Sequence, residues 1–92
     1  MRYHVAVPPQ VEMSVKHLHP GLKKKIKEAL KLLEENPHTG KPLQGKLAGL
    51  MSFRATYYRI VYRVVLRKKW IEIVDIGPRK TIYERFFGWK LS

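Results

Sequence analysis

The sequence contains no cysteine. This absence excludes disulfide bonds, thiolate nucleophiles and zinc sites with cysteine ligands. Four histidines remain, and His17 and His19 lie too close together in the chain to form a usual metal pair without further ligands. The sequence also has no glycine-rich phosphate loop and no Ser/His/Asp arrangement. We therefore expect neither a metal site nor a small-molecule cofactor.

Long apolar runs are missing as well. No stretch approaches the roughly 18 apolar residues that a membrane-spanning helix needs, and no signal peptide opens the chain. We expect a cytoplasmic protein that has no membrane partner.

Acidic residues are scarce. The chain has 7 Asp and Glu against 19 Lys and Arg, a formal net charge of +12, and no acidic residue between Gly40 and Lys69. Basic domains of this kind bind nucleic acid, the ribosome or an acidic protein. The hydrophobic fraction of 45% is typical of a folded protein, and 92 residues suffice for one core but not two. We expect a single domain over residues 1–92.

The spacing of apolar residues predicts an α+β fold. Two helices are expected at residues 9–18 and 22–35, and strands at residues 3–7, 50–54, 58–66 and 70–76. The triplet His19-Pro20-Gly21 should break the first helix, Asn36-Pro37 should end the second, and Gly77-Pro78 should end the last strand. The resulting order, β-α-α-β-β-β, predicts a helical hairpin packed on a small, mainly antiparallel sheet. An aromatic C-terminal tail with Phe86, Phe87 and Trp89 follows, which could form a short helix.

Residues 36–49 form a long connection rich in proline and glycine. Loops of this length are often functional. We expect Leu43 and Leu47 to point inward and Lys41 and Lys46 to stay exposed.

The strand at residues 58–66 divides its side chains between two faces. Tyr58, Ile60, Tyr62, Val64 and Leu66 should face the core, and Arg59, Val61, Arg63, Val65 and Arg67 should form a charged, partly apolar platform. Side chains two residues apart on a strand are about 7 Å apart, close to the spacing of successive phosphates in an extended strand of nucleic acid. Such a ladder of side chains could follow a phosphate backbone. The alternative is that this face is simply exposed to water and binds nothing.

Arg79 and Tyr83 follow the last strand. If Gly77-Pro78-Arg79 ends a neighbouring strand, Arg79 reaches the rim of the sheet and Tyr83 could return above the same surface. RNA cleavage by the 2′-hydroxyl requires a base, an acid and cations around the phosphate. Arg59 and Arg79 suit the electrostatic role and Tyr83 suits proton transfer or base stacking, although ordinary packing of an aromatic tail would also explain Tyr83. Further candidates for phosphate binding are Lys41, Lys46, Arg54, Arg63, Arg67 and Lys80.

The run PLQGKLAGLMSFRATYYRIVYRV, followed by VDIGPRKTIY, resembles the RelE branch of the RelE/ParE superfamily of toxins from toxin–antitoxin pairs. The resemblance implies a RelE-like fold and a ribosome-dependent, metal-independent endoribonuclease that cleaves messenger RNA, inhibits translation and is silenced by a cognate antitoxin. By position, Arg59 and Arg79 match the family arginines that hold the scissile phosphate. Tyr83 matches the tyrosine that stacks or assists proton transfer.

The chain departs from the family pattern at three positions. Leu50 and Ser52 stand where some members carry lysines, and Pro78 stands where many carry histidine. These changes remove candidate proton-transfer groups, and Arg54, Lys41 or Lys46 could supply the lost charge. Two other functions therefore stay open: a ParE-type inhibitor of DNA gyrase, and a non-catalytic module that binds RNA or the ribosome.

Overall fold

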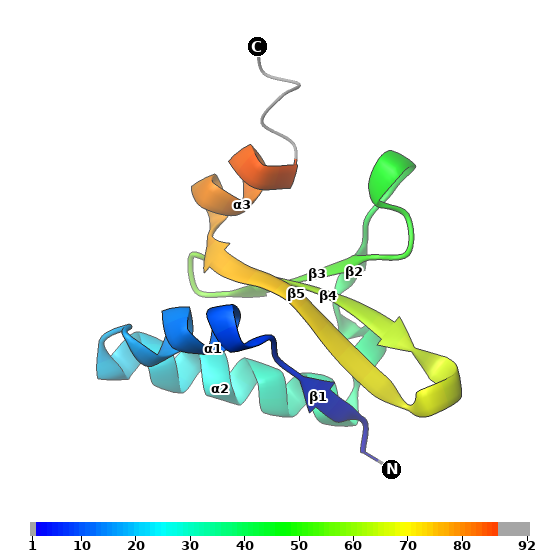
Figure 1. Ribbon diagram of the computed structural model, residues 1–92, viewed down its shortest axis with the longest axis horizontal. Helices are drawn as coiled ribbons and strands as arrows, with labels where there is room; N and C mark the ends of the chain where they lie inside the picture. The colour runs from blue at the N-terminus through cyan, green and yellow to red at the C-terminus, as the bar shows by residue number, and fades with distance from the viewer. Residues whose placement is uncertain (1, 87–92) are drawn as a thin grey trace.

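The computed structural model describes residues 2–86. Three helices pack on a five-stranded mixed sheet, which confirms the predicted α+β class (Figure 1). The helices are α1 (Pro9–Lys16), α2 (Pro20–Glu35) and α3 (Arg79–Phe86). The strands are β1 (His4–Ala6), β2 (Lys41–Pro42), β3 (Met51–Ala55), β4 (Tyr58–Val65) and β5 (Trp70–Pro78). Short 3-10 turns occur at η1 (Pro37–Thr39), η2 (Gly45–Leu47) and η3 (Leu66–Lys68).

The sheet has the strand order β1-β5-β4-β3-β2. Strand β1 runs parallel to β5, and the other neighbouring pairs are antiparallel. The mainly antiparallel sheet is therefore confirmed, with β1 at one edge. The register between β4 and β5 shifts between Val61 and Tyr62, so that Val74 has no partner in β4.

Helix α2 supplies much of the core. Its buried residues are Leu22, Ile26, Ala29 and Leu33, which follow the predicted helical stripe. They pack with Ile60, Tyr62 and Ile71 of the sheet. The lysines of α2 lie on its other faces.

Helix α2 begins earlier than its sequence pattern predicts. Pro20 and Gly21, expected to lie in a break, form its first turn. Proline fits this position because its fixed φ suits a helix and the first turn needs no N–H donor. The His19 Nδ1 atom accepts a hydrogen bond of 3.3 Å from the Leu22 amide and so caps the helix. The preceding helix α1 ends at Lys16, two residues before the predicted boundary.

The connection between α2 and β3 contains one more strand than expected. Residues 41–42 form β2, in which Lys41 pairs with Ser52 and Pro42 with Met51. Within this connection Leu43 and Leu47 are half-buried, and Lys41 and Lys46 are exposed, as predicted.

The two faces of β4 are largely as predicted. Tyr58, Ile60 and Tyr62 are buried in the core, but Leu66 is 63% exposed because β4 ends at Val65 and the chain turns into η3. On the opposite face Val61 is only 1% exposed. It shares a small cavity with Ile82 of α3, which places α3 on the face opposite α1 and α2 (Figure 1).

The predicted end of the last strand needs correction, and part of the predicted aromatic tail lies beyond the described residues. Strand β5 continues to Pro78, two residues past its predicted end, because Pro78 pairs with Tyr58 at the last position of the strand. The C-terminal segment forms α3 as far as Phe86. Phe87 and Trp89 lie outside the described residues.

Candidate nucleic-acid interface

Arg59 lies on the face of β4 that α3 partly covers. Its lateral neighbours in the sheet are Arg54 on β3 and Gly77 on β5. Gly77 has no side chain, and a Cβ atom there would lie 3.5 Å from the Ile82 side chain, so α3 packs over this position. Two guanidinium groups directly across from each other repel, and a bound anion would relieve this repulsion.

Arg79 is the first residue of α3. Its backbone amide donates a hydrogen bond of 2.8 Å to the carbonyl oxygen of Tyr57. This bond ties the start of α3 to the turn between β3 and β4. The Arg79 guanidinium carbon lies 5.0 Å from the centre of the Tyr83 ring, within the range of a cation–π contact.

The arginine pocket is a cavity of about 340 Å³ lined by Arg54, Thr56, Tyr57, Arg59 and Arg79. The Arg54 Nε atom donates a hydrogen bond of 3.0 Å to the carbonyl oxygen of Thr56. Within residues 2–86, none of the three guanidinium groups forms an ion pair with a carboxylate. The pocket therefore concentrates positive charge that the described part of the protein does not neutralise.

Tyr83 lies between two cavities next to the arginine pocket. The first, the tyrosine pocket, has a volume of about 550 Å³ and is lined by Tyr57, Pro78, Arg79, Lys80, Tyr83 and Glu84. The second, the Lys41 pocket, is smaller, about 140 Å³, and its lining includes Lys41, Ser52, Arg59 and Tyr83. Tyr83 thus shares one cavity with Arg79 and the other with Arg59.

Of the six further candidates for phosphate binding, three lie at these cavities. Arg54 lines the arginine pocket, Lys41 the Lys41 pocket and Lys80 the tyrosine pocket. Lys46 lies in η2 and Arg67 in η3, and neither lines these three cavities.

The predicted ladder of arginines along β4 does not form. Arg59 and Arg63 are four residues apart on the strand, roughly 13 Å, and the buried Val61 lies between them. Arg63 also lies 3.4 Å from a carboxylate oxygen of Glu72, so its charge has an internal partner. Arg67 lies beyond the end of the strand. The charge instead gathers at the other end of β4, around Arg59.

Two of the three positions that set the chain apart from the pattern it resembles line these cavities. Ser52 pairs in register with Lys41, and both line the Lys41 pocket, so a lysine from the edge strand β2 lies beside Ser52. Pro78 contributes an apolar wall to the tyrosine pocket.

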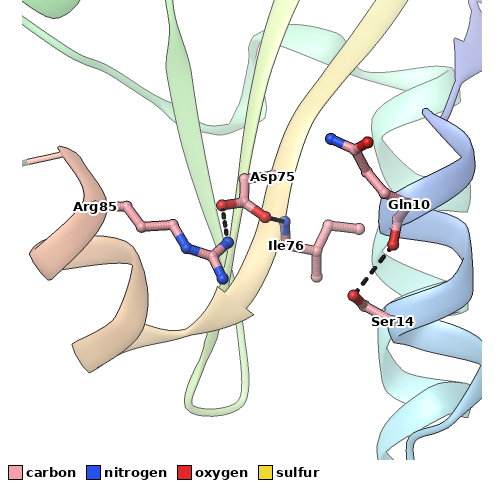
Figure 2. A network of polar contacts seen from close by, with 5 residues as sticks. All are labelled: Gln10, Ser14, Asp75, Ile76 and Arg85. Carbon is pink, nitrogen blue, oxygen red and sulfur yellow. Dashed lines mark hydrogen bonds and ion pairs between the residues drawn. The ribbon is translucent and has the colours of Figure 1, made fainter.

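Sequence reasoning missed two features of the site. Tyr57, which lines two of the cavities, lies between the strands predicted at residues 50–54 and 58–66 and was not among the candidates; its aromatic ring in a short hairpin turn was the available signal. The second feature is Asp75 of β5, which accepts hydrogen bonds from the Arg85 guanidinium and from the Ile76 amide at 2.9 Å (Figure 2). The ion pair of Asp75 and Arg85 anchors α3 to the sheet and so helps to place Arg79 and Tyr83.

Within residues 2–86, no group of three or more His, Asp or Glu side chains is placed to hold a metal ion. The helices of this same part of the chain are too short or too polar to span a membrane.

Comparisons of the sequence and of the fold with known proteins point to one family. The model of the family described as the ParE toxin of the type II toxin–antitoxin system parDE matches residues 12–83. No curated protein sequence matches the chain.

Solved structures of toxin–antitoxin complexes match the fold. The RelBE2 complex of Mycobacterium tuberculosis has a chain with 28% identity and a TM-score of 0.77, and the match covers 86% of this chain and 100% of that chain. The archaeal RelE–RelB complex of Pyrococcus horikoshii matches with 27% identity and a TM-score of 0.71 over 86% of this chain and 97% of that chain. The YoeB–YefM complex of Staphylococcus aureus matches with 26% identity and a TM-score of 0.66 over 84% and 97%. The chain therefore belongs to the ParE toxin family and is a RelE-like toxin of a type II toxin–antitoxin system.

Proposed function

We propose that this toxin inhibits translation by cleaving messenger RNA on the ribosome. One observation carries the proposal: Arg59 and Arg79 line a single cavity, have no carboxylate partner within residues 2–86, and each shares a further cavity with Tyr83. A scissile phosphate bound in the arginine pocket would meet both guanidinium groups and lie near a phenol. A ribosomal substrate would place the protein in the cytoplasm.

The proposed reaction is attack of a ribose 2′-hydroxyl on the adjacent phosphorus. The new 2′-O–P bond forms, the bond from phosphorus to the 5′ oxygen breaks, and the products are a 2′,3′-cyclic phosphate and a 5′-hydroxyl. Arg59 and Arg79 stabilise the negative charge that develops on the phosphoryl oxygens, because guanidinium groups bind phosphate through two parallel hydrogen bonds. Arg54 adds a third positive charge to the same cavity.

Proton transfer is assigned to Tyr83. The phenol donates its proton to the departing 5′ oxygen, while the proton of the 2′-hydroxyl passes to water. Pro78, Leu50 and Ser52 carry no group that could take over this step at neutral pH. Lys41 contributes charge at the adjacent Lys41 pocket.

Primer extension on ribosome-bound transcripts tests this proposal. The wild-type protein should produce new 3′ ends, and Arg79→Ala should lower the cleavage rate by about 10²- to 10³-fold while the protein stays folded. Arg2→Ala is the matched control, because Arg2 is an exposed guanidinium beside β1, where it pairs with Glu35. Tyr83→Phe keeps the ring and removes the hydroxyl, so its loss of rate separates proton transfer from stacking. Intact transcripts with the wild-type protein would refute the proposal, and salt-sensitive binding without product would indicate the non-catalytic module.

A second function, inhibition of DNA gyrase, is supported by two observations. The matching family model is the one described for ParE, and three family positions for proton transfer or charge are occupied by Leu50, Ser52 and Pro78. A gyrase supercoiling assay separates the two functions. The gyrase inhibitor would block supercoiling and spare translation, whereas the RNA-cleaving toxin would do the reverse.

We also propose an antitoxin as the protein partner. The matched structures include complexes of a toxin with its antitoxin. With a net charge of +12, this chain would attract a partner segment rich in acidic residues. Because such a segment would compete with RNA for the arginine pocket, Arg59→Ala should weaken both interactions.

A further inference from the structure

We infer that Tyr57 is a further base-binding residue of the tyrosine pocket, where it adds a second aromatic wall beside Tyr83, for which stacking is already implied by the family resemblance. This inference rests on the proposed function, since it assigns the part of the RNA that lies next to the bound phosphate. Its ligand is a base flanking the scissile bond, held by stacking on the aromatic rings.

The Tyr57 ring is exposed but held in place. Its side chain is 60% exposed, and its ring packs edge-on against the ring of Tyr58, with centroids 5.1 Å apart and planes at 74°. Tyr58 is buried, and the carbonyl oxygen of Tyr57 accepts the hydrogen bond from the Arg79 amide. The neighbouring residue Thr56 has a φ of 56°, a conformation that β-branched residues rarely adopt. The turn therefore presents an aromatic surface to solvent in a defined position.

The tyrosine pocket adjoins the arginine pocket. Tyr57 and Arg79 line both cavities, so the two share a wall. A phosphate in the arginine pocket would bring the base of a flanking nucleotide to the tyrosine pocket. This arrangement matches the connectivity of one nucleotide, in which phosphate and base are joined through a single sugar.

The lining of the tyrosine pocket suits a base. Tyr57, Tyr83 and the Pro78 ring provide apolar surface, and stacking on aromatic rings accepts any base because every base has a π face. Lys80 and Glu84 stand at the same cavity with opposite charges. A carboxylate accepts hydrogen bonds from exocyclic amino groups, and an ammonium group donates to ring nitrogens and carbonyl oxygens. Pro78, which interrupts the family pattern, thus becomes part of a binding surface.

The test combines base removal with ring removal. Ribosomes are programmed with a synthetic message that carries a 2′-deoxy nucleotide at the attacking position, which prevents cleavage and allows the affinity of the toxin to be measured. The base on either side of the scissile bond is replaced by an abasic site. Binding is measured for wild type, Tyr57→Ala and Tyr57→Phe, with Leu66→Ala as the control because Leu66 is similarly exposed in the turn η3 at the other end of β4.

If the base stacks on Tyr57, Tyr57→Ala should weaken binding by about 10- to 100-fold, whereas Tyr57→Phe and Leu66→Ala should bind like wild type. One of the two abasic sites should weaken wild-type binding by a similar factor and cause no further loss in Tyr57→Ala. If the losses of affinity from Tyr57→Ala and from the abasic site multiply when the two are combined, the inference is overturned. Wild-type affinity for Tyr57→Ala would overturn it as well.

A parallel assay with the all-ribose message separates this inference from the proposed function. If the abasic site causes no further loss of affinity in Tyr57→Ala but the all-ribose message stays intact, the subsite is supported and the nuclease is refuted. If the message is cleaved but the two losses of affinity multiply, only the subsite is refuted.

Discussion

The hydroxyl of Tyr62 donates a hydrogen bond of 2.7 Å to the carbonyl oxygen of Pro37. The same hydroxyl accepts a hydrogen bond of 3.1 Å from the Gly40 amide. Tyr62 is fully buried in the middle of β4, and Gly40 directly precedes Lys41 of β2. One side chain of the core therefore ties the segment that carries Lys41 to the strand that carries Arg59.

Tyr62→Phe should destabilise the fold. The substitution keeps the ring but leaves the Gly40 amide and the Pro37 carbonyl without their shared partner, at a cost of about 1 to 3 kcal/mol in the free energy of unfolding. Urea denaturation measures this loss. Tyr3→Phe is the control, because the Tyr3 hydroxyl makes no hydrogen bond within the described residues. Equal stabilities for the two variants would contradict the role assigned to Tyr62.

High pH should weaken the fold through the same side chain. Burial raises the pKa of the Tyr62 hydroxyl, and the hydrogen bond from Gly40 lowers it by less. Because the pKa is higher in the folded state, the contribution of neutral Tyr62 to stability is fully present below the unfolded pKa of about 10 and is lost as pH rises through the folded pKa. The stability advantage of wild type over Tyr62→Phe should therefore be constant below about pH 10 and shrink as the pH rises further. Denaturation series at several pH values check this, and a difference that stays constant above about pH 10 would disprove it.

Gly40→Ala should also destabilise the fold, for a steric reason. A Cβ atom at this position would lie 2.5 Å from the Tyr62 hydroxyl oxygen and 2.8 Å from the carbonyl oxygen of Ser52. Either β2 separates from β3 or the hydrogen bonds of Tyr62 break, and we expect a loss of about 1 to 3 kcal/mol in thermal or chemical unfolding. Gly21→Ala is the matched control. Gly21 lies within α2, and a Cβ atom there would be 3.5 Å from the His19 ring, an ordinary contact. This substitution should therefore be neutral or stabilising.

Substitutions of Lys41 should show whether this residue supplies charge. Lys41→Arg keeps the positive charge and should retain most RNA cleavage, whereas Lys41→Gln should lose about 10- to 100-fold, the value of one charged hydrogen bond. Lys25→Gln on the exposed surface of α2 is the control and should match wild type. Rates come from single-turnover cleavage of ribosome-bound RNA. If Lys41→Arg loses as much activity as Lys41→Gln, Lys41 transfers a proton instead.

The long regular elements were predictable because their patterns repeat within the sequence. Apolar residues at helical spacing defined α2, and alternation along residues 58–66 assigned the side chains of β4 to the two faces of the sheet. Strand β2 was missed because two residues carry no periodic pattern. Lys41 and Pro42 form a strand only through pairing with β3.

Alternation on a strand assigns a side chain to a face, but it does not reveal what else lies on that face. Arg59 and Arg63 share a face, yet Arg63 pairs with Glu72 from the next strand, and Arg59 faces a cavity. The partner of Arg63 lies beyond the stretch without acidic residues, so the local charge count overstated the unpaired charge. Tyr57 lies at the cavities because its carbonyl oxygen accepts a hydrogen bond from the Arg79 amide, and this contact between distant residues leaves no pattern in the sequence.

The sequence by itself determined the fold class, the basic character and the identity of the candidate residues Arg59, Arg79 and Tyr83, because periodicity, composition and motif are properties of the chain. The tertiary structure decided which cations gather at a common site. Strand register and the ion pair of Asp75 with Arg85 bring the start of β4, the turn at Tyr57 and the start of α3 together. These contacts join residues that are distant in the chain, and no local pattern encodes their distances.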